Sequence, residues 1–99
     1  MADYRNESIE RLYHVITGIR TMEECSDFFE DLCTIREIQD MAQRLDTAIL
    51  LDRGMSYQSI ADEIGISTAT ISRVKRCLVY GSNGYRRAID EMKKTENEI

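Results

Sequence analysis

The chain has 99 residues, of which 42% are hydrophobic, and a formal net charge of −5. This length suits one domain with a real core, and the absence of proline leaves long helices possible. No apolar stretch approaches the roughly 20 residues of a membrane-spanning helix, and the acidic N-terminus lacks the apolar segment of a signal peptide. These features exclude a membrane protein and lead us to expect a cytoplasmic one.

Apolar residues recur at helical spacing through the first half of the chain. The first stripe predicts an amphipathic helix over about Tyr4–Thr17. Each of the next two stripes begins with a threonine that is followed three residues later by a glutamate. This capping-box spacing predicts helices over about Thr21–Leu32 and Thr34–Arg53. We expect residues 1–54 to be dimerisation helices, because a chain of this size has difficulty burying all of these apolar stripes on itself.

Residues 56–80 have the pattern of a helix-turn-helix. After a short apolar stripe comes Gly65, where a positive φ costs glycine little, and then Ser67, which is placed to cap a second helix. That helix directs Ile71 and Val74 inward, and its opposite face is polar and carries cations. A short polar helix held out from a small core is the shape that enters a major groove.

The last predicted helix covers residues 85–94, after the glycine-bounded segment 81–84. The polar residues 95–99 are expected to be a frayed tail. No alternating strand pattern of useful length is present. The sequence therefore predicts an all-α fold of six helices, organised as one domain over residues 1–94.

The negative charge lies mostly outside the helix-turn-helix. Residues 1–34 hold eight acidic residues against three arginines, a balance of −5, whereas residues 56–80 have a balance of +1. Non-specific DNA affinity should nevertheless be weak, because it depends on neutralising phosphates. The most direct interpretation of the N-terminal acids is a solvated face.

The polar residues of the helix-turn-helix fall into two predicted roles. Candidates for contacts with base edges, on the second helix, are Thr68, Ala69, Ser72 and Arg73. Candidates for contacts with phosphates are Ser56, Tyr57, Gln58, Lys75 and Arg76. Ser67, at the start of the second helix, completes the predicted DNA-binding set. The alternative for each residue is an ordinary solvated side chain.

Several segments taken together resemble the Trp repressor superfamily, in particular its small YerC/YecD-like branch. The resemblance extends from about Tyr4 to Met92 and is strongest over residues 33–44 and 55–73. It includes a Gly-Met-Ser turn, then Glu-Ile-Gly, then Ala-Thr-Ile-Ser-Arg. The resemblance implies an intertwined homodimer with two helix-turn-helix units that bind operator DNA, as in bacterial transcriptional regulators.

The same resemblance implies a possible effector pocket. In the namesake, tryptophan acts as corepressor in a pocket whose arginines and threonines match Thr34, Arg44, Thr70 and Arg73. A glycine and a serine of that pocket are replaced here by Val74 and Cys77. The valine occupies space and the thiol is a poorer hydrogen-bond partner than a hydroxyl, which argues against tryptophan as cofactor. For Arg44, the alternative is a surface charge that pairs with Glu37 or Asp40.

Nothing in the sequence indicates catalysis or a metal site. The single histidine, His14, lies off the apolar stripe and is interpreted as solvated. The cysteines Cys25, Cys33 and Cys77 lack zinc or redox spacing and are interpreted as reduced thiols. We therefore predict a non-enzymatic, sequence-specific regulator that binds double-stranded DNA, most simply a repressor. The alternatives are a helical protein–protein interaction module, which the net acidity favours, or a ligand-sensing regulator without strong intrinsic DNA binding.

Overall fold

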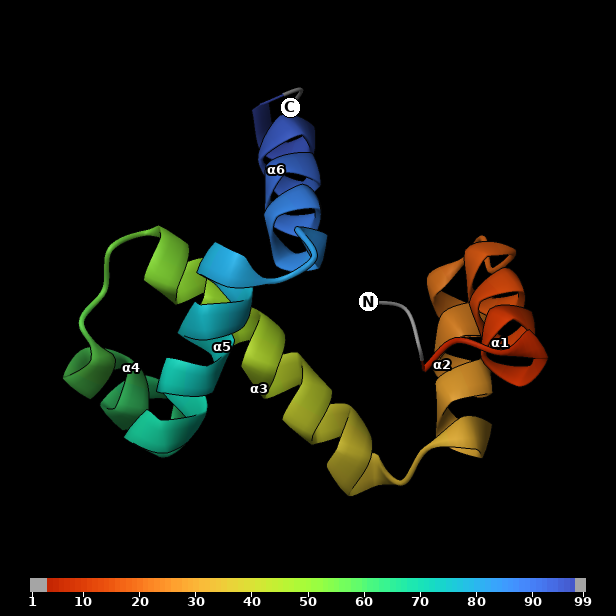
Figure 1. Cartoon of the computed structure of the whole chain (residues 1–99), viewed down its shortest axis with the longest axis horizontal. Helices are drawn as coiled ribbons and strands as arrows, with labels where there is room; N and C mark the ends of the chain where they lie inside the picture. Colours follow the sequence, from red (N-terminus) through yellow and green to blue (C-terminus); the bar gives the residue numbers. More distant parts are fainter. Residues whose placement is uncertain (1–3, 98–99) are drawn as a thin grey trace. The chain divides into compact units, whose positions relative to one another are not determined.

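Residues 4–97, which the computed structural model describes, fold into six α-helices (Figure 1). Their bounds are α1 Glu7–Thr17, α2 Met22–Leu32, α3 Ile35–Asp52, α4 Tyr57–Ile64, α5 Thr68–Tyr80 and α6 Gly84–Asn97. The predicted all-α class and the number of helices are confirmed. The chain divides into two compact units, residues 1–38 and 39–99, and each is described by itself.

The first helix, α1, begins later than the apolar stripe predicts. Asn6 has an extended backbone, and its side chain accepts a hydrogen bond from the Ile9 amide at 2.9 Å, so α1 begins at Glu7 rather than at Tyr4. The side chain of Tyr4 instead lies beside the helix, where its hydroxyl is 3.1 Å from that of Tyr13.

Both predicted capping threonines start a helix in this unit. The Thr34 hydroxyl accepts from the Glu37 amide, and the Glu37 carboxylate accepts from the Thr34 amide at 2.8 Å, a complete capping box. At α2 only half of the box is present. Thr21 caps the Glu24 amide, but the Glu24 carboxylate accepts from the amide of Arg20 instead of from that of Thr21.

No residue of α1 or α2 is buried, although both helices are described over their full length and both are amphipathic. Phe28 and Phe29 are only half-buried and pack edge to face, with ring centroids 5.6 Å apart. Val15 is 45% exposed and Met22 is 87% exposed. The stripe residues are mostly half-buried, so the apolar stripes of the first unit are only partly covered within one chain: Ile9, Leu12, Ile16, Cys25, Phe28 and Phe29.

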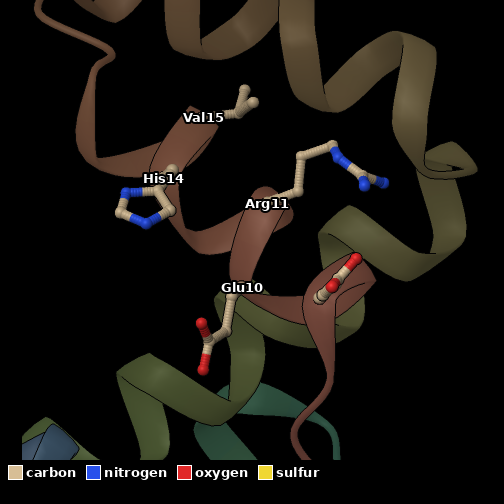
Figure 2. Close-up of a pocket in the computed structure, with 5 residues that line it drawn as sticks. Glu10, Arg11, His14 and Val15 are labelled. Atoms are coloured by element: carbon tan, nitrogen blue, oxygen red, sulfur yellow. The ribbon is translucent and has the colours of Figure 1, made fainter.

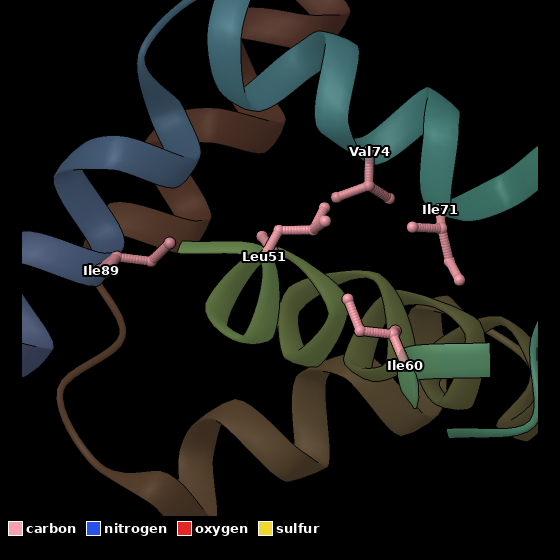
Figure 3. Packing of buried hydrophobic residues seen from close by; sticks show 6 residues of the cluster. Leu51, Ile60, Ile71, Val74 and Ile89 are labelled. Atoms are coloured by element: carbon pink, nitrogen blue, oxygen red, sulfur yellow. The ribbon is translucent and has the colours of Figure 1, made fainter. Parts of the chain in front are cut away.

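The second unit contains the core. Its buried apolar side chains come from four helices: Ala48 and Leu51 of α3, Ile60 of α4, Ile71 and Val74 of α5, and Ile89 of α6 (Figure 3). Met55, Ile64, Ile66 and Leu78 pack around them. This core holds α4 and α5 against the C-terminal part of α3.

The C-terminal helix is longer than predicted. It runs to Asn97, so residues 95–97 are helical rather than part of a frayed tail, and residues 98–99 lie outside the described part of the chain. Two cations of α6 bind the Asp52 carboxylate at the end of α3, with Arg86 Nη1 and Lys93 Nζ each 2.7 Å from one of its oxygens. Together with the buried Ile89, these two ion pairs attach α6 to the rest of the second unit.

Some residues on the apolar stripes of the second unit remain exposed. Ala42 and Ala88, which the spacing places with the core residues, are exposed, and Leu45 and Met92 are 36% and 39% exposed. The periodicity identified the apolar faces of α3 and α6 correctly. It could not show that a single chain covers only part of each face.

Candidate nucleic-acid interface

We call α4, α5 and the turn between them the reading unit. Its first helix, α4, is fixed at both ends by local hydrogen bonds. The hydroxyl of Ser56 accepts from the Ser59 amide at 3.2 Å and starts α4. Gly65 ends it in the left-handed conformation, with φ of 81°, and its amide donates to the Ala61 carbonyl at 2.9 Å. The chain therefore turns sharply at the position where the sequence predicts a positive φ.

The second helix of the reading unit begins as predicted. Ser67 is extended, and its hydroxyl accepts from the Thr70 amide at 3.2 Å. Ile71 is fully buried and Val74 is 3% exposed, so the inner face of α5 is anchored in the core. Because these two side chains point inward, the rotation of α5 about its axis is fixed.

The outer face of α5 is exposed along its length. The residues predicted to contact base edges or phosphates from this helix are all exposed: Thr68, Ala69, Ser72, Arg73, Lys75 and Arg76. The segment Thr68–Tyr80 contains three cations and no acidic residue. An exposed helix of this composition has a positive, polar surface with small residues that permit close approach to a duplex.

Three predicted phosphate contacts lie on α4 or just before it. Ser56, Tyr57 and Gln58 are exposed, but two of their side chains are already engaged within the protein. The Ser56 hydroxyl donates to the hydroxyl of Ser59, and Gln58 donates from Nε2 to the Asp62 carboxylate at 2.9 Å. Ser59, which is not among the predicted DNA contacts, is thus brought to the same helix end.

A cavity of about 280 Å³ lies beside α5, within the second unit. It is lined by Arg44, Thr70, Arg73, Val74, Cys77 and Tyr85. Three of the four residues predicted for an effector pocket are therefore brought together. The fourth, Thr34, belongs to the first unit, where its hydroxyl caps α3. Tyr85 was not predicted, because the loop between α5 and α6 gives no indication of where α6 returns.

The first unit has a larger hollow of about 500 Å³, but it is a surface depression along a single helix. Figure 2 shows Glu10, Arg11, His14 and Val15 projecting from α1 around it. All four are exposed, and His14 is exposed as its sequence position predicts. The described residues contain no group of three or more His, Cys, Asp or Glu side chains that could hold a metal ion. None of the helices in residues 4–97 is long and apolar enough to cross a membrane.

Comparison with known proteins gives consistent matches over most of the chain. The family model described as Trp repressor protein matches residues 7–93. The uncharacterized protein YerC of Bacillus subtilis (strain 168) is 51% identical over 94 residues, which cover 95% of this chain and 90% of YerC.

Two crystal structures have the same fold. A TrpR-like protein from Eubacterium eligens ATCC 27750 is 42% identical, with a TM-score of 0.87 over 90% of this chain and 92% of its own. A candidate Trp repressor from Staphylococcus aureus is 43% identical, with a TM-score of 0.86 over 91% of this chain and 90% of its own.

Proposed function

Because this chain belongs to the Trp repressor protein family, we propose that it is a sequence-specific transcriptional regulator that binds operator DNA as a homodimer and represses from there. The family consists of non-enzymatic regulators, and membership in it suggests DNA binding. Beyond family membership, we propose which residues contact DNA, that the protein acts as a two-fold dimer, and that it represses transcription.

The observation that carries the proposal is the outer face of α5. That face is exposed, holds three cations without an acidic residue, and is fixed in rotation by the burial of Ile71 and Val74. Thr68, Ala69, Ser72 and Arg73 read base edges, with Arg73 suited to bidentate contact with guanine. The remaining predicted residues, Ser56, Tyr57, Gln58, Ser67, Lys75 and Arg76, hold the backbone and set the register.

The exposed apolar side chains of the first unit support a homodimer. Side chains such as Met22, Leu32 and Ile35 are at least half exposed in the single chain, and burying them against a second copy is favourable at about 25 cal/mol per Å². A two-fold pair of reading helices would contact two half-sites about 34–36 Å apart, one turn of the duplex. One reading unit alone would recognise only a few base pairs.

Selection of bound duplexes from a random-sequence library, followed by binding measurements at several stated salt concentrations, tests the proposal. We expect enrichment of a two-fold symmetric site that the protein binds at least about a thousandfold more tightly than unselected duplex. Selection that enriches no sequence, or equal affinity for selected and unselected duplex, would refute sequence-specific regulation.

Two substitutions separate the proposed roles on α5. Arg73→Ala should weaken binding to the selected site by about 1–3 kcal/mol and relax the preference at one position. Lys75→Ala should weaken all duplexes alike and reduce the dependence of log K on log salt by about one. Identical behaviour of the two variants would show that the assignment of roles is wrong.

The cavity beside α5 favours a small anionic effector as an addition to this function. Arg44, Arg73 and Thr70 supply cationic and hydroxyl donors, while Val74 and Cys77 make the cavity a poor match for tryptophan. Thermal-shift measurements with amino acids and small carboxylates test this. A ligand that raises the midpoint in the wild type, but not in Arg44→Ala, is expected, and no stabilisation by any of them would indicate a ligand-independent regulator.

A further inference from the structure

One hydrogen bond on the exposed side of α4 is unexplained by the packing of that helix. Gln58 donates from Nε2 to Asp62 Oδ1 at 2.9 Å, and both residues are exposed. They are four positions apart, so they are neighbours on the helix surface. Ile60, midway between them, is fully buried and lies slightly more than half a turn from each. The pair is therefore on the side of α4 that faces away from the core.

This bond fixes how the Gln58 amide can be used. A carboxylate only accepts hydrogen bonds, so Asp62 requires the amide nitrogen rather than the amide oxygen to face it. One N–H of the amide is then occupied and its second N–H remains a donor. An amide that is already oriented loses less side-chain freedom when it binds a partner. The free N–H of this amide can donate to a hydrogen-bond acceptor such as a phosphate oxygen.

We propose that Asp62 is a positioning residue for DNA binding, which holds the Gln58 amide so that its free N–H donates to a backbone phosphate. This inference rests on the proposed function, because it assigns the pair to the phosphate contacts of the first reading helix. Asp62 also brings a negative charge to a surface that meets phosphates. That charge reduces affinity for every sequence alike and leaves more of the total affinity to the base contacts of α5.

The chain supplies a matched control at the next position. Glu63 is exposed on α4 and carries the same charge, but it is not the acceptor for Gln58. Removing either carboxylate relieves the same kind of repulsion from phosphates. Only removal of Asp62 releases the amide. The difference between equivalent substitutions at the two positions therefore isolates the positioning effect.

The experiment compares Asp62→Ala with Glu63→Ala, each in the wild type and in a Gln58→Ala background. Dissociation constants are measured on a duplex selected by the wild type and on the unselected library duplex. We expect Asp62→Ala to bind both duplexes about two- to tenfold more weakly than Glu63→Ala, the effect of one hydrogen bond. That difference should vanish in the Gln58→Ala background. Asp62→Asn, whose side-chain oxygen still accepts, should behave like Glu63→Gln.

Three outcomes overturn the inference. Equal affinities of Asp62→Ala and Glu63→Ala would mean that the bond has no part in DNA binding. A difference that persists in the Gln58→Ala background would mean that Asp62 acts without Gln58. A loss of affinity that merely follows a lowered thermal midpoint, with no coupling between the two positions, would identify a helix-stabilising pair. Binding of neither duplex by the wild type would refute the proposed function as well, whereas the first three outcomes leave that function intact.

Discussion

The two units of this chain use the same helical patterns but bury them differently. In the second unit, four helices form a common core in which Ile60, Ile71 and Ile89 are at most 2% exposed. In the first unit, α1 and α2 are amphipathic to a similar degree, yet none of their residues is buried. The two units also differ in net charge, which is −5 over residues 1–38 and zero over residues 39–99.

This difference indicates how the work is divided along the chain. A unit with its own core holds its shape by intrachain packing, and the proposed DNA binding requires such a fixed arrangement of α4 and α5. For a unit whose apolar faces are only partly covered, we expect further packing against the second copy in the proposed dimer. Because the first unit carries the net charge of −5, we expect like-charge repulsion to disfavour its contact with phosphates. We expect the two units to respond differently to equivalent changes.

The largest effect is expected for a truncation in the core of the second unit. Ile71→Ala removes a fully buried side chain that contributes to the core beside Ile60, and should lower the free energy of unfolding by about 2–5 kcal/mol. Val79→Ala on the same helix, where the side chain is 54% exposed, should cost less than about 1 kcal/mol. Urea unfolding at two protein concentrations measures both. Similar costs for the two variants would contradict an intrachain core.

A substitution in the first unit should instead act on assembly. Met22 lines an apolar hollow of about 330 Å³ with Phe29 and Ile35, and Met22→Lys places a charge where the second copy is expected to pack. The dimer dissociation constant should rise at least about tenfold, or about 1.4 kcal/mol, in sedimentation equilibrium. Glu23→Lys, at the adjacent position, changes the charge more but should leave the dimer intact. Equal weakening of the dimer by Met22→Lys and Glu23→Lys would show that charge alone causes the effect.

The attachment of α6 provides a pH-dependent test within the second unit. Hydrogen bonds from Lys93, and next from Arg86, lower the pKa of the Asp52 carboxyl. A lowered folded-state pKa means that this carboxylate stabilises the fold above its unfolded pKa, near 4, and that the contribution is lost as the pH falls through the folded value. The side chains of Lys93 and Arg86 are 56% and 40% exposed, which limits the effect.

Asp52→Asn should therefore lower stability by about 1–2 kcal/mol at neutral pH, and the difference from wild type should shrink below about pH 4. Asp90→Asn is the control. Asp90 is 3.9 Å from Arg86 and 57% exposed, so its loss should change stability by less than about 0.5 kcal/mol. Thermal unfolding across this pH range measures both variants. If the stability lost in Asp52→Asn does not change with pH, the stabilising role of Asp52 does not depend on its charge.

The smallest expected effect concerns backbone conformation at the turn between the reading helices. Gly65 has φ of 81°, so Gly65→Ala should cost about 1 kcal/mol although nothing lies near the added methyl group. Gly84 also has open space but no positive φ, and it begins α6. Gly84→Ala should thus be neutral or stabilising by a few tenths of a kcal/mol, measured in the same urea titrations.

Much of the fold could be predicted because local chemistry determines helix ends. Thr34, Ser67 and Gly65 each act at the position where the sequence places them. The start of α1 was wrong because the apolar stripe extends past the cap that Asn6 provides. The predicted end of α6 is wrong because polar composition alone does not end a helix: α6 continues to Asn97, and the Thr95 hydroxyl donates to the Glu91 carbonyl.

The site was less predictable, because it depends on contacts between distant segments. The exposure of Ser72 and Arg73 follows from the helical period, given that Ile71 and Val74 point inward. The wall that Tyr85 contributes to the cavity depends on where α6 packs, which no local pattern encodes. Likewise, amphipathicity predicted the apolar faces of α1 and α2 without indicating what covers them.

The burial of Ile60 and Ile71, one on each reading helix, has a calorimetric consequence. Both side chains are already buried in the free protein, so we expect no folding of α4 or α5 when the protein binds a duplex. Coupled folding would add a large negative heat-capacity change to complex formation. The heat capacity of association should instead match the area of the contact surface alone, and binding should be close to rigid docking.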